Sequence, residues 1–183
     1  MPPVLVAFVA GASGAWRIVR MDAVAGEGLS MAARLAMLEV HEAWVLGEGS
    51  WVLRGVTSNT RYTHRPEADT LAARQQGLDR PQASRAALIP IRKTEAWWSL
   101  AQDERRAIFE ERSRHIGIGL DYLPAIARRL HHSRELGEPF DFLTWFEYAP
   151  EHADAFEEMV RRLRMTEEWR YVDREVDIRL SRV

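Results

Sequence analysis

The chain has 183 residues, a length that suits a single domain spanning residues 1–183. Its apolar fraction of 46% and charged fraction of 28% indicate a globular protein with a core, and the absence of cysteine excludes thiolate catalysis, cysteine-bound zinc, iron–sulfur clusters and thiolate-ligated haem. A net charge of −2 provides no basic field for nucleic acid or an anionic membrane, so neither is an expected partner.

The first apolar run predicts a strand of the core. Residues 4–10 are apolar and residues 11–15 are small, a composition that also occurs in signal peptides. However, no basic segment precedes the run, and strand-like alternation resumes at Trp16. We expect a strand, a glycine-rich turn and a second strand in a cytoplasmic protein. No stretch is long enough to cross a bilayer.

The next segment combines a helix, a strand and a long polar connection. Residues 28–39 are predicted to form a short amphipathic helix with Ser30 as its N-cap. Residues 51–56 are typical of a strand. The polar stretch 57–86 contains two prolines and a glycine, so it holds at most one short helix. Such a length of irregular chain in a compact domain is more often functional than not.

The middle of the chain predicts a strand followed by a helix. Residues 87–91 form an apolar strand, and Pro90 places that strand at the edge of a sheet or at its own end. Residues 103–116 show helical spacing of apolar residues with acidic residues in the first turn. Gly117 and Gly119 are expected to end this helix.

A second helix is predicted over residues 123–132, with Pro124 in its first turn. His131 and His132 would then lie at its C-terminus, where cations favour the helix dipole, and we expect both on the surface. Residues 140–148 are apolar on both faces, which indicates a central strand.

The last elements complete the fold prediction. Residues 152–163 predict a helix, and residues 169–180 alternate between apolar and charged side chains like a strand. This mixture favours an α+β fold in which helices cover one face of an antiparallel sheet.

His115 is the histidine most open to a functional interpretation. It lies on the same helical stripe as Ile108 and Ile116. A single histidine on an apolar face is usually a core residue with a satisfied hydrogen bond. Alternatively, it is an axial haem ligand, which requires a neutral imidazole and a carboxylate partner for its other ring nitrogen. Spacing alone leaves both interpretations open.

A second candidate is the run from Ile91 to Trp98, which contains Lys93, the only lysine of the chain, and the adjacent Trp97 and Trp98. Two indoles beside a basic pair could flank a flat anionic ligand such as a porphyrin, or the run could simply join a strand to a helix. No phosphate-binding loop, nucleophile elbow or paired-histidine zinc motif occurs in the sequence.

Several longer stretches resemble the chlorite dismutase family, specifically its short, typically dimeric form. The matching stretches include Ala86–Lys93, Ala96–Trp98, Gln102–Glu111, Tyr122–Arg128, Pro139–Glu147 and Thr166–Trp169, with residues 51–62 upstream. The first 50 residues or so resemble the family only loosely.

The resemblance implies a ferredoxin-like fold of the dimeric α/β-barrel type, one haem b in each subunit, and a homodimer. In this interpretation His115 is the proximal iron ligand and Glu168 accepts a hydrogen bond from it. Arg128 is the distal arginine, a choice over Arg129 that helical periodicity could not make.

The same resemblance implies a set of cofactor-binding residues. Lys93 would pair a haem propionate, and Trp97 and Trp98 would lie close to the haem. Gln75 would restrain the distal arginine. The remaining residues expected near the cofactor are Asn59, Arg61, Tyr62 and Leu123.

The implied reaction converts chlorite, a small anion, to chloride and dioxygen. Chlorite would bind ferric haem and transfer oxygen to leave a ferryl and transient hypochlorite, which Arg128 retains until the two recombine. The rival functions are a haem- or coproporphyrin-processing relative, with peroxidase-like or decarboxylase-like chemistry, and a haem-binding module without turnover.

Overall fold

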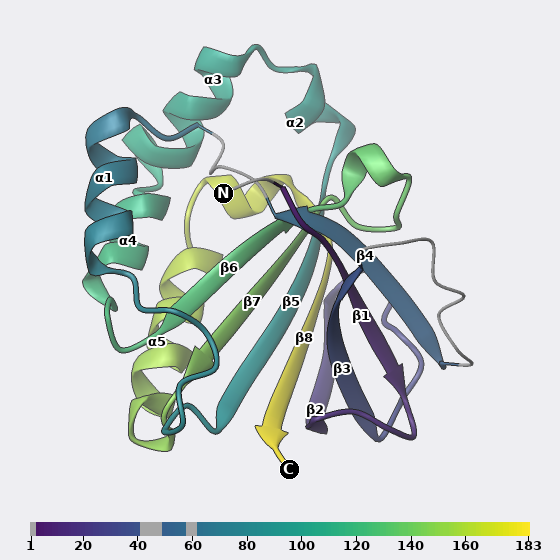
Figure 1. Cartoon of the computed structure of the whole chain (residues 1–183). Helices are drawn as coiled ribbons and strands as arrows, with labels where there is room; N and C mark the ends of the chain where they lie inside the picture. The colour runs from purple at the N-terminus through teal and green to yellow at the C-terminus, as the bar shows by residue number, and fades with distance from the viewer. Residues whose placement is uncertain (1–2, 41–48, 58–61) are drawn as a thin grey trace.

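The computed structural model describes residues 3–40, 49–57 and 62–183 (Figure 1). The strands in this part of the chain are β1 (Leu5–Gly11), β2 (Trp16–Ala25), β3 (Arg34–Val40), β4 (Trp51–Thr57), β5 (Arg85–Lys93), β6 (Ala127–His132), β7 (Phe142–Tyr148) and β8 (Val172–Arg182). The helices are α1 (Arg65–Arg74), α2 (Glu95–Ser99), α3 (Gln102–Arg106), α4 (His115–Asp121) and α5 (Ala153–Arg164). Shorter turns are the π-helical η1 (Ala107–Arg112) and the 3₁₀ turns η2 (Arg134–Leu136), η3 (Pro150–His152) and η4 (Glu168–Tyr171).

The strands of the described residues close into an antiparallel barrel in the order β1-β3-β2-β8-β5-β7-β6-β4, and β4 returns to pair with β1. The predicted ferredoxin-like α+β fold, an antiparallel sheet with helices on one face, is therefore wrong. The residue patterns predicted antiparallel pairing but not its closure, and the barrel that the resemblance implied was of the ferredoxin-like α+β type, not this closed β-barrel.

The closure was missed because two of the strands were predicted as helices. β3 lies in the predicted helix 28–39 and pairs with β1 from Leu5↔Val40 to Gly11↔Arg34. β6 lies in the predicted helix 123–132 and joins β7 to β4. Both segments contain alanine, leucine and arginine, whose helix preference is a weak prior that strand pairing overrides. A sheet without these two strands cannot close.

Proline did not place β5 at an edge, because β5 lies in the sheet between β7 and β8. The β5–β8 register passes from Leu88↔Ile178 to Ile91↔Glu175, so Pro90, which has no N–H, lies between paired positions. The prediction of a strand at 87–91 is confirmed, and its edge position is wrong.

The helix predicted over 103–116 is split. α3 runs into the π-helical η1, and α4 then begins at His115 instead of ending there. Gly117 and Gly119, expected to end a helix, lie inside α4.

The predictions of strands at the N-terminus, at 51–56 and at 140–148 are confirmed, as are those of the helix at 152–163 and the C-terminal strand. Within the described residues, no helix has both the length and the apolar character needed to cross a membrane.

Alternation along the strands creates two apolar layers. The barrel interior is filled by large side chains such as Phe8, Leu88 and Trp145. On the outer surface of β5 and β7, Ile89 and Phe146 pack against α5. Figure 1 shows α1, α4 and α5 gathered on the side of the barrel where β6 and β7 lie. This outer layer between strands and helices is where the candidate site is built.

His131 and His132 are buried on β6, so their predicted surface position is wrong. The ring of His131 bonds through Nδ1 to the carbonyl oxygen of Leu143 at 2.9 Å, and its Nε2 accepts from Arg129 Nε at 3.1 Å. The ring is therefore neutral, since a proton on Nε2 would face the guanidinium N–H. Burial is the main cause that lowers the pKa of His131 to about 4.

We expect this histidine to make the protein less stable in acid. Its pKa in the folded state lies below the unfolded value of 6.5, so its contribution is complete above pH 6.5 and is lost as pH falls towards 4. The free energy of unfolding should fall by about 3 kcal/mol over this window. Urea unfolding across pH 4–7 measures the slope, and His131→Gln should flatten it. An equal slope in that variant would contradict the assignment.

Candidate functional site

A cavity of about 560 Å³ lies between the outward-facing side chains of β5, β6 and β7 and the helices α1, α4 and α5. Its wall is mainly apolar, with Ile89, Phe109, Leu130 and Phe146 among the lining residues. Protein cavities that bind cofactors commonly measure about 300–1,000 Å³ and combine such a wall with a few polar groups. The polar groups of this cavity come from opposite sides of it.

His115 enters the cavity from the first residue of α4. Arg114, directly before it, has a φ of 52°, a left-handed conformation that breaks the chain away from η1. Glu110 then caps the new helix: its carboxylate accepts from Ile116 N at 2.6 Å and from Gly117 N at 3.2 Å. These two backbone N–H groups have no partner within α4, so Glu110 fixes the point at which His115 projects.

Neutralising this cap should destabilise α4 and loosen His115. We expect Glu110→Gln to cost about 1–2 kcal/mol in the free energy of unfolding, because an amide offers one good acceptor to two N–H groups. The matched control is Glu111→Gln, at the exposed neighbouring position. Urea unfolding of both variants checks the prediction. Equal stability of the two would contradict the capping role.

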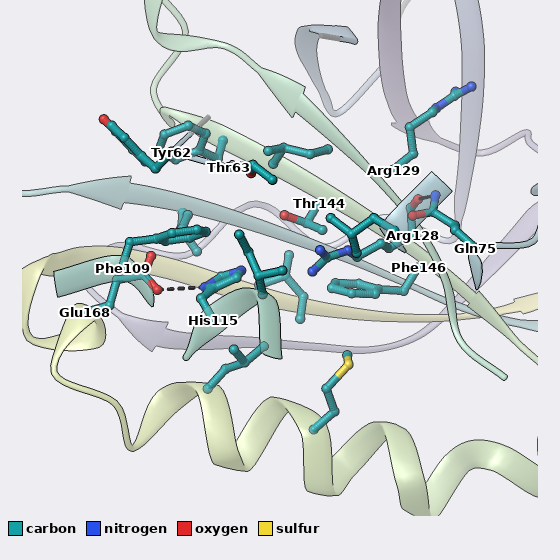
Figure 2. A pocket seen from close by; sticks show the side chains of 18 of the residues that line it. Tyr62, Thr63, Gln75, Phe109, His115, Arg128, Arg129, Thr144, Phe146 and Glu168 are labelled. Atoms are coloured by element: carbon teal, nitrogen blue, oxygen red, sulfur yellow. Dashed lines mark hydrogen bonds and ion pairs between the residues drawn. The ribbon is translucent and has the colours of Figure 1, made fainter. Parts of the chain in front are cut away.

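His115 is the first member of a buried hydrogen-bonded row. Its Nδ1 bonds to Glu168 Oε2 at 2.7 Å (the dashed line in Figure 2), and the other carboxylate oxygen of Glu168 lies 2.6 Å from Lys93 Nζ. The side chains of Glu168 and Lys93 are 4% and 2% exposed, so water competes little with either contact. The backbone N–H of Glu168 donates to Ser113 Oγ at 3.0 Å, which ties η4 to the turn before α4.

Burial alone would raise the pKa of Glu168, but the charges and hydrogen bonds of His115 and Lys93 outweigh it and lower the pKa to about 2. Glu168 is therefore ionised and accepts from both neighbours. A carboxylate that accepts from Nδ1 leaves Nε2 of the imidazole with its lone pair available.

Aromatic rings hold the imidazole in place. The ring of Phe109 stacks on that of His115 with centroids 4.4 Å apart, and Trp169 lies parallel at 6.4 Å. Trp97 is buried in the cavity wall, and Lys93 Nζ lies 4.2 Å from its ring centroid. Rotation of His115 would break these ring contacts as well as its hydrogen bond.

Arg128 lies on the opposite wall and points towards His115 (Figure 2). The side chains of a strand alternate, so on β6 the guanidinium of Arg128 points into the cavity, whereas that of Arg129, another lining residue, is directed towards His131 and Glu39. In the described part of the chain, the guanidinium of Arg128 has no ion-pair partner. Burial lowers the pKa of Arg128, and the charge of Glu110 opposes that shift. An arginine remains charged under these conditions, so the cavity presents a cation to an incoming anion.

Gln75, directly after α1, holds the backbone of this arginine. Its amide nitrogen donates a short hydrogen bond to the carbonyl oxygen of Arg128. Gln75 therefore contacts the main chain of β6 at Arg128.

The chain matches the family model described as chlorite dismutase over residues 28–183. It is also similar to the dimeric chlorite dismutase of Nitrobacter winogradskyi, with 57% sequence identity, 97% coverage of this chain, 99% of that chain and a TM-score of 0.91. The chain belongs to the chlorite dismutase family. The predicted family and enzyme class are thereby confirmed.

More distant members show that the fold is shared. A variant of chlorite dismutase from Candidatus Nitrospira defluvii in complex with cyanide has 23% identity and a TM-score of 0.68, and the match covers 97% of this chain and 90% of that one. The enzyme from the same organism in complex with imidazole has 23% identity and a TM-score of 0.66, with 97% and 91% covered.

Of the other residues that the resemblance to chlorite dismutases indicated, Tyr62 lines the cavity, whereas Trp98 and Leu123 are not among its lining residues. The hydroxyl of Tyr62 accepts from Arg105 Nη1 at 3.0 Å. Trp98 turns to Asp141, to which its indole N–H donates at 3.1 Å, and Leu123 packs behind the wall with Leu71 and Ile116. Asn59 and Arg61 lie outside the described residues.

Two features of this chlorite dismutase site were not predicted. The first is the break at Arg114: it places Phe109 and Glu110 in η1, before the break, and Gly119 inside a new helix that the glycines were expected to prevent. The observed partner of Lys93 also differs from the expected haem propionate, since Nζ is buried against Glu168. A left-handed arginine carries no sequence signal that would have indicated this break.

Proposed function

We propose that the cavity binds haem b and that the protein converts chlorite to chloride and dioxygen. The observation that carries the proposal is the pairing of two groups across one apolar cavity: the imidazole of His115, bonded through Nδ1 to Glu168, and the guanidinium of Arg128 on the facing wall. The first group suits an axial iron ligand, and the second suits an anionic substrate.

The residues present fit a haem. A cavity of about 560 Å³ with apolar walls suits a flat macrocycle, and His115 Nε2 is the one ring nitrogen that Glu168 does not engage. The described residues contain no group of three or more histidine, aspartate or glutamate side chains that could hold a bare metal ion. A prosthetic group that needs a single protein ligand matches this donor set better than a polydentate metal site.

Bound haem would supply the iron at which an oxygen atom leaves chlorite. The chain's own contribution on the proximal side is to hold His115 as a strong donor. Glu168 keeps the Nδ1 proton in a short hydrogen bond, which makes Nε2 more basic. We propose that Lys93 acts by fixing Glu168, in place of the propionate contact that the resemblance implied.

On the distal side Arg128 would bind the chlorite anion through charge-assisted hydrogen bonds and orient it. It would then hold transient hypochlorite in the cavity until the two oxygen atoms join. Both chlorite oxygens leave as dioxygen and the chlorine leaves as chloride, so atoms and charge balance. The apolar wall excludes water, which strengthens the interaction of the guanidinium with the anion.

An oxygen electrode tests the proposal directly. The haem-loaded protein should release one dioxygen for each chlorite consumed. A protein with bound haem that gives a flat trace with chlorite would favour a haem-binding module or a porphyrin-processing relative. Oxidation of dyes alone does not discriminate between these functions, because any haem protein whose iron reaches a high oxidation state can oxidise dyes in a side reaction.

We also propose that the protein is a cytoplasmic homodimer. The dimeric form of the Nitrobacter winogradskyi relative supports the assembly, and sedimentation would measure it. The apolar run near the N-terminus forms β1 of the barrel and buries Val6, Phe8 and Ala10, so it is part of the folded domain.

A further inference from the structure

Gly119 lies in close contact with the guanidinium of Arg128. It is four residues after His115 in α4, so the two positions share one face of the helix, one turn apart. His115 projects from that face into the cavity. At position 119 the same face has no side chain, and the space is taken by the end of Arg128.

The three atoms nearest to a side chain at this position would all belong to the guanidinium of Arg128. A Cβ built on Gly119 would lie 2.8 Å from Arg128 Nη1, 3.2 Å from Cζ and 3.5 Å from Nη2. Carbon and nitrogen atoms that are not bonded do not approach to 2.8 Å. All three atoms belong to the mobile end of a long side chain, so the guanidinium would move and the backbone would not.

The conformation of Gly119 does not explain why glycine is there. The backbone is helical, which every L-residue adopts, and glycine is a poor helix former. The position is also buried. What the glycine provides at this position is room for the guanidinium.

We propose that Gly119 is a positioning residue that keeps the guanidinium of Arg128 inside the cavity, opposite His115. α4 then positions both polar groups of the site. Its first residue, His115, carries the imidazole, and Gly119, one turn later, leaves the space that the guanidinium of Arg128 occupies. This inference rests on the proposed function for its consequence, but the contact itself does not depend on haem.

The test compares Gly119→Ala with Gly117→Ala. The two substitutions make the same chemical change in the same helix and raise helix propensity equally. A Cβ on Gly117 would have its nearest neighbours at 3.5 Å, an ordinary contact, and these belong to Arg114. Only the change at position 119 should therefore move Arg128.

The first readout needs no haem. In protein labelled with ¹⁵N-arginine, the side-chain Nε–H resonance of Arg128 is assigned from its loss in Arg128→Lys. Gly119→Ala should shift this resonance, and Gly117→Ala should leave it in place. An unshifted Arg128 resonance in folded Gly119→Ala would overturn the proposal, whatever the protein does with chlorite.

The second readout is the affinity of the haem-loaded protein for fluoride, followed by visible absorption. Gly119→Ala should weaken fluoride binding about tenfold or more, because a charge-assisted hydrogen bond is lost. Gly117→Ala should stay within about twofold of wild type, a change smaller than the loss of any hydrogen bond. On the Arg128→Ala background, Gly119→Ala should have no further effect. An equal loss on that background would show that Gly119 acts independently of Arg128.

The outcomes separate this proposal from the proposed function. Wild-type protein that binds no haem would contradict the proposed function, while the ¹⁵N resonance would still test Gly119. Should Gly119→Ala fail to fold, the double variant Gly119→Ala/Arg128→Ala removes the predicted clash and should fold. A double variant that also fails would overturn the assignment of the clash to Arg128.

Discussion

Arg128→Ala is expected to bind haem as wild type does, and to be inactivated irreversibly while it turns over chlorite. The variant keeps His115, the proposed iron ligand, and its carboxylate partner Glu168. It loses the guanidinium that faces the imidazole across the cavity. Removing a preorganised charge-stabilising donor commonly costs about 10²–10³ in rate, and we expect at least a tenfold loss in the number of turnovers before inactivation.

The reason for inactivation is escape of hypochlorite into the cavity wall. Met159 and Trp97 line the cavity and are buried, so they are exposed to an oxidant formed inside it. Addition of one oxygen to Met159, detected by mass spectrometry, should accompany the loss of activity. The control is Arg129→Ala, which should keep durable turnover because the Arg129 guanidinium is directed towards His131 and away from His115. Arg128→Ala that turns over chlorite as durably as wild type would contradict the retention role.

Glu168→Gln is expected to cost about 3–5 kcal/mol in the free energy of unfolding. The substitution removes the charge that balances Lys93, whose ammonium group is buried 2.6 Å from the carboxylate. It also leaves one amide oxygen for two donors, His115 Nδ1 and Lys93 Nζ. Urea unfolding of the protein without added haem measures this loss alone.

The double variant Lys93→Met/Glu168→Gln separates the ion pair from the histidine contact. Replacing both charges should recover most of the lost stability, because no uncompensated charge then remains buried. The haem reduction potential should stay above that of wild type in the single and the double variant, since a neutral amide makes His115 a weaker donor. Breaking a buried ion pair is expected to cost several kcal/mol. A loss of less than about 1 kcal/mol in the free energy of unfolding of Glu168→Gln would therefore contradict the account of this buried pair.

The parts of the fold with strong periodicity could be predicted from the sequence. β7 is apolar on both faces, α5 has one apolar stripe, and β8 alternates along most of its length. β3 and β6 could not, because their residues favour helices and become strands only through pairing with neighbours distant in the chain. The barrel depends on these two strands, so its closure could not be predicted either.

The candidate site, like the fold, could be predicted from the sequence only in part. Residue spacing brought attention to His115 but left a core residue and a ligand as alternatives, and only the resemblance to the family indicated Glu168 and Arg128. The reason is geometric. Glu168 is 53 residues from His115 in sequence, and the choice of Arg128 over Arg129 requires the two-residue repeat of a strand where a helix was predicted. The contacts of Gly119 and Glu110 depend on a left-handed residue that no sequence pattern marks.

Hemin titration of wild type and His115→Ala tests the central claim most directly. Wild-type protein should take up one equivalent of hemin and give the Soret band of an imidazole-ligated iron. His115→Ala should lose that band, and added imidazole should restore it by filling the space of the missing side chain. An unaltered band in His115→Ala, or no band in wild type, would contradict ligation of the iron by this histidine.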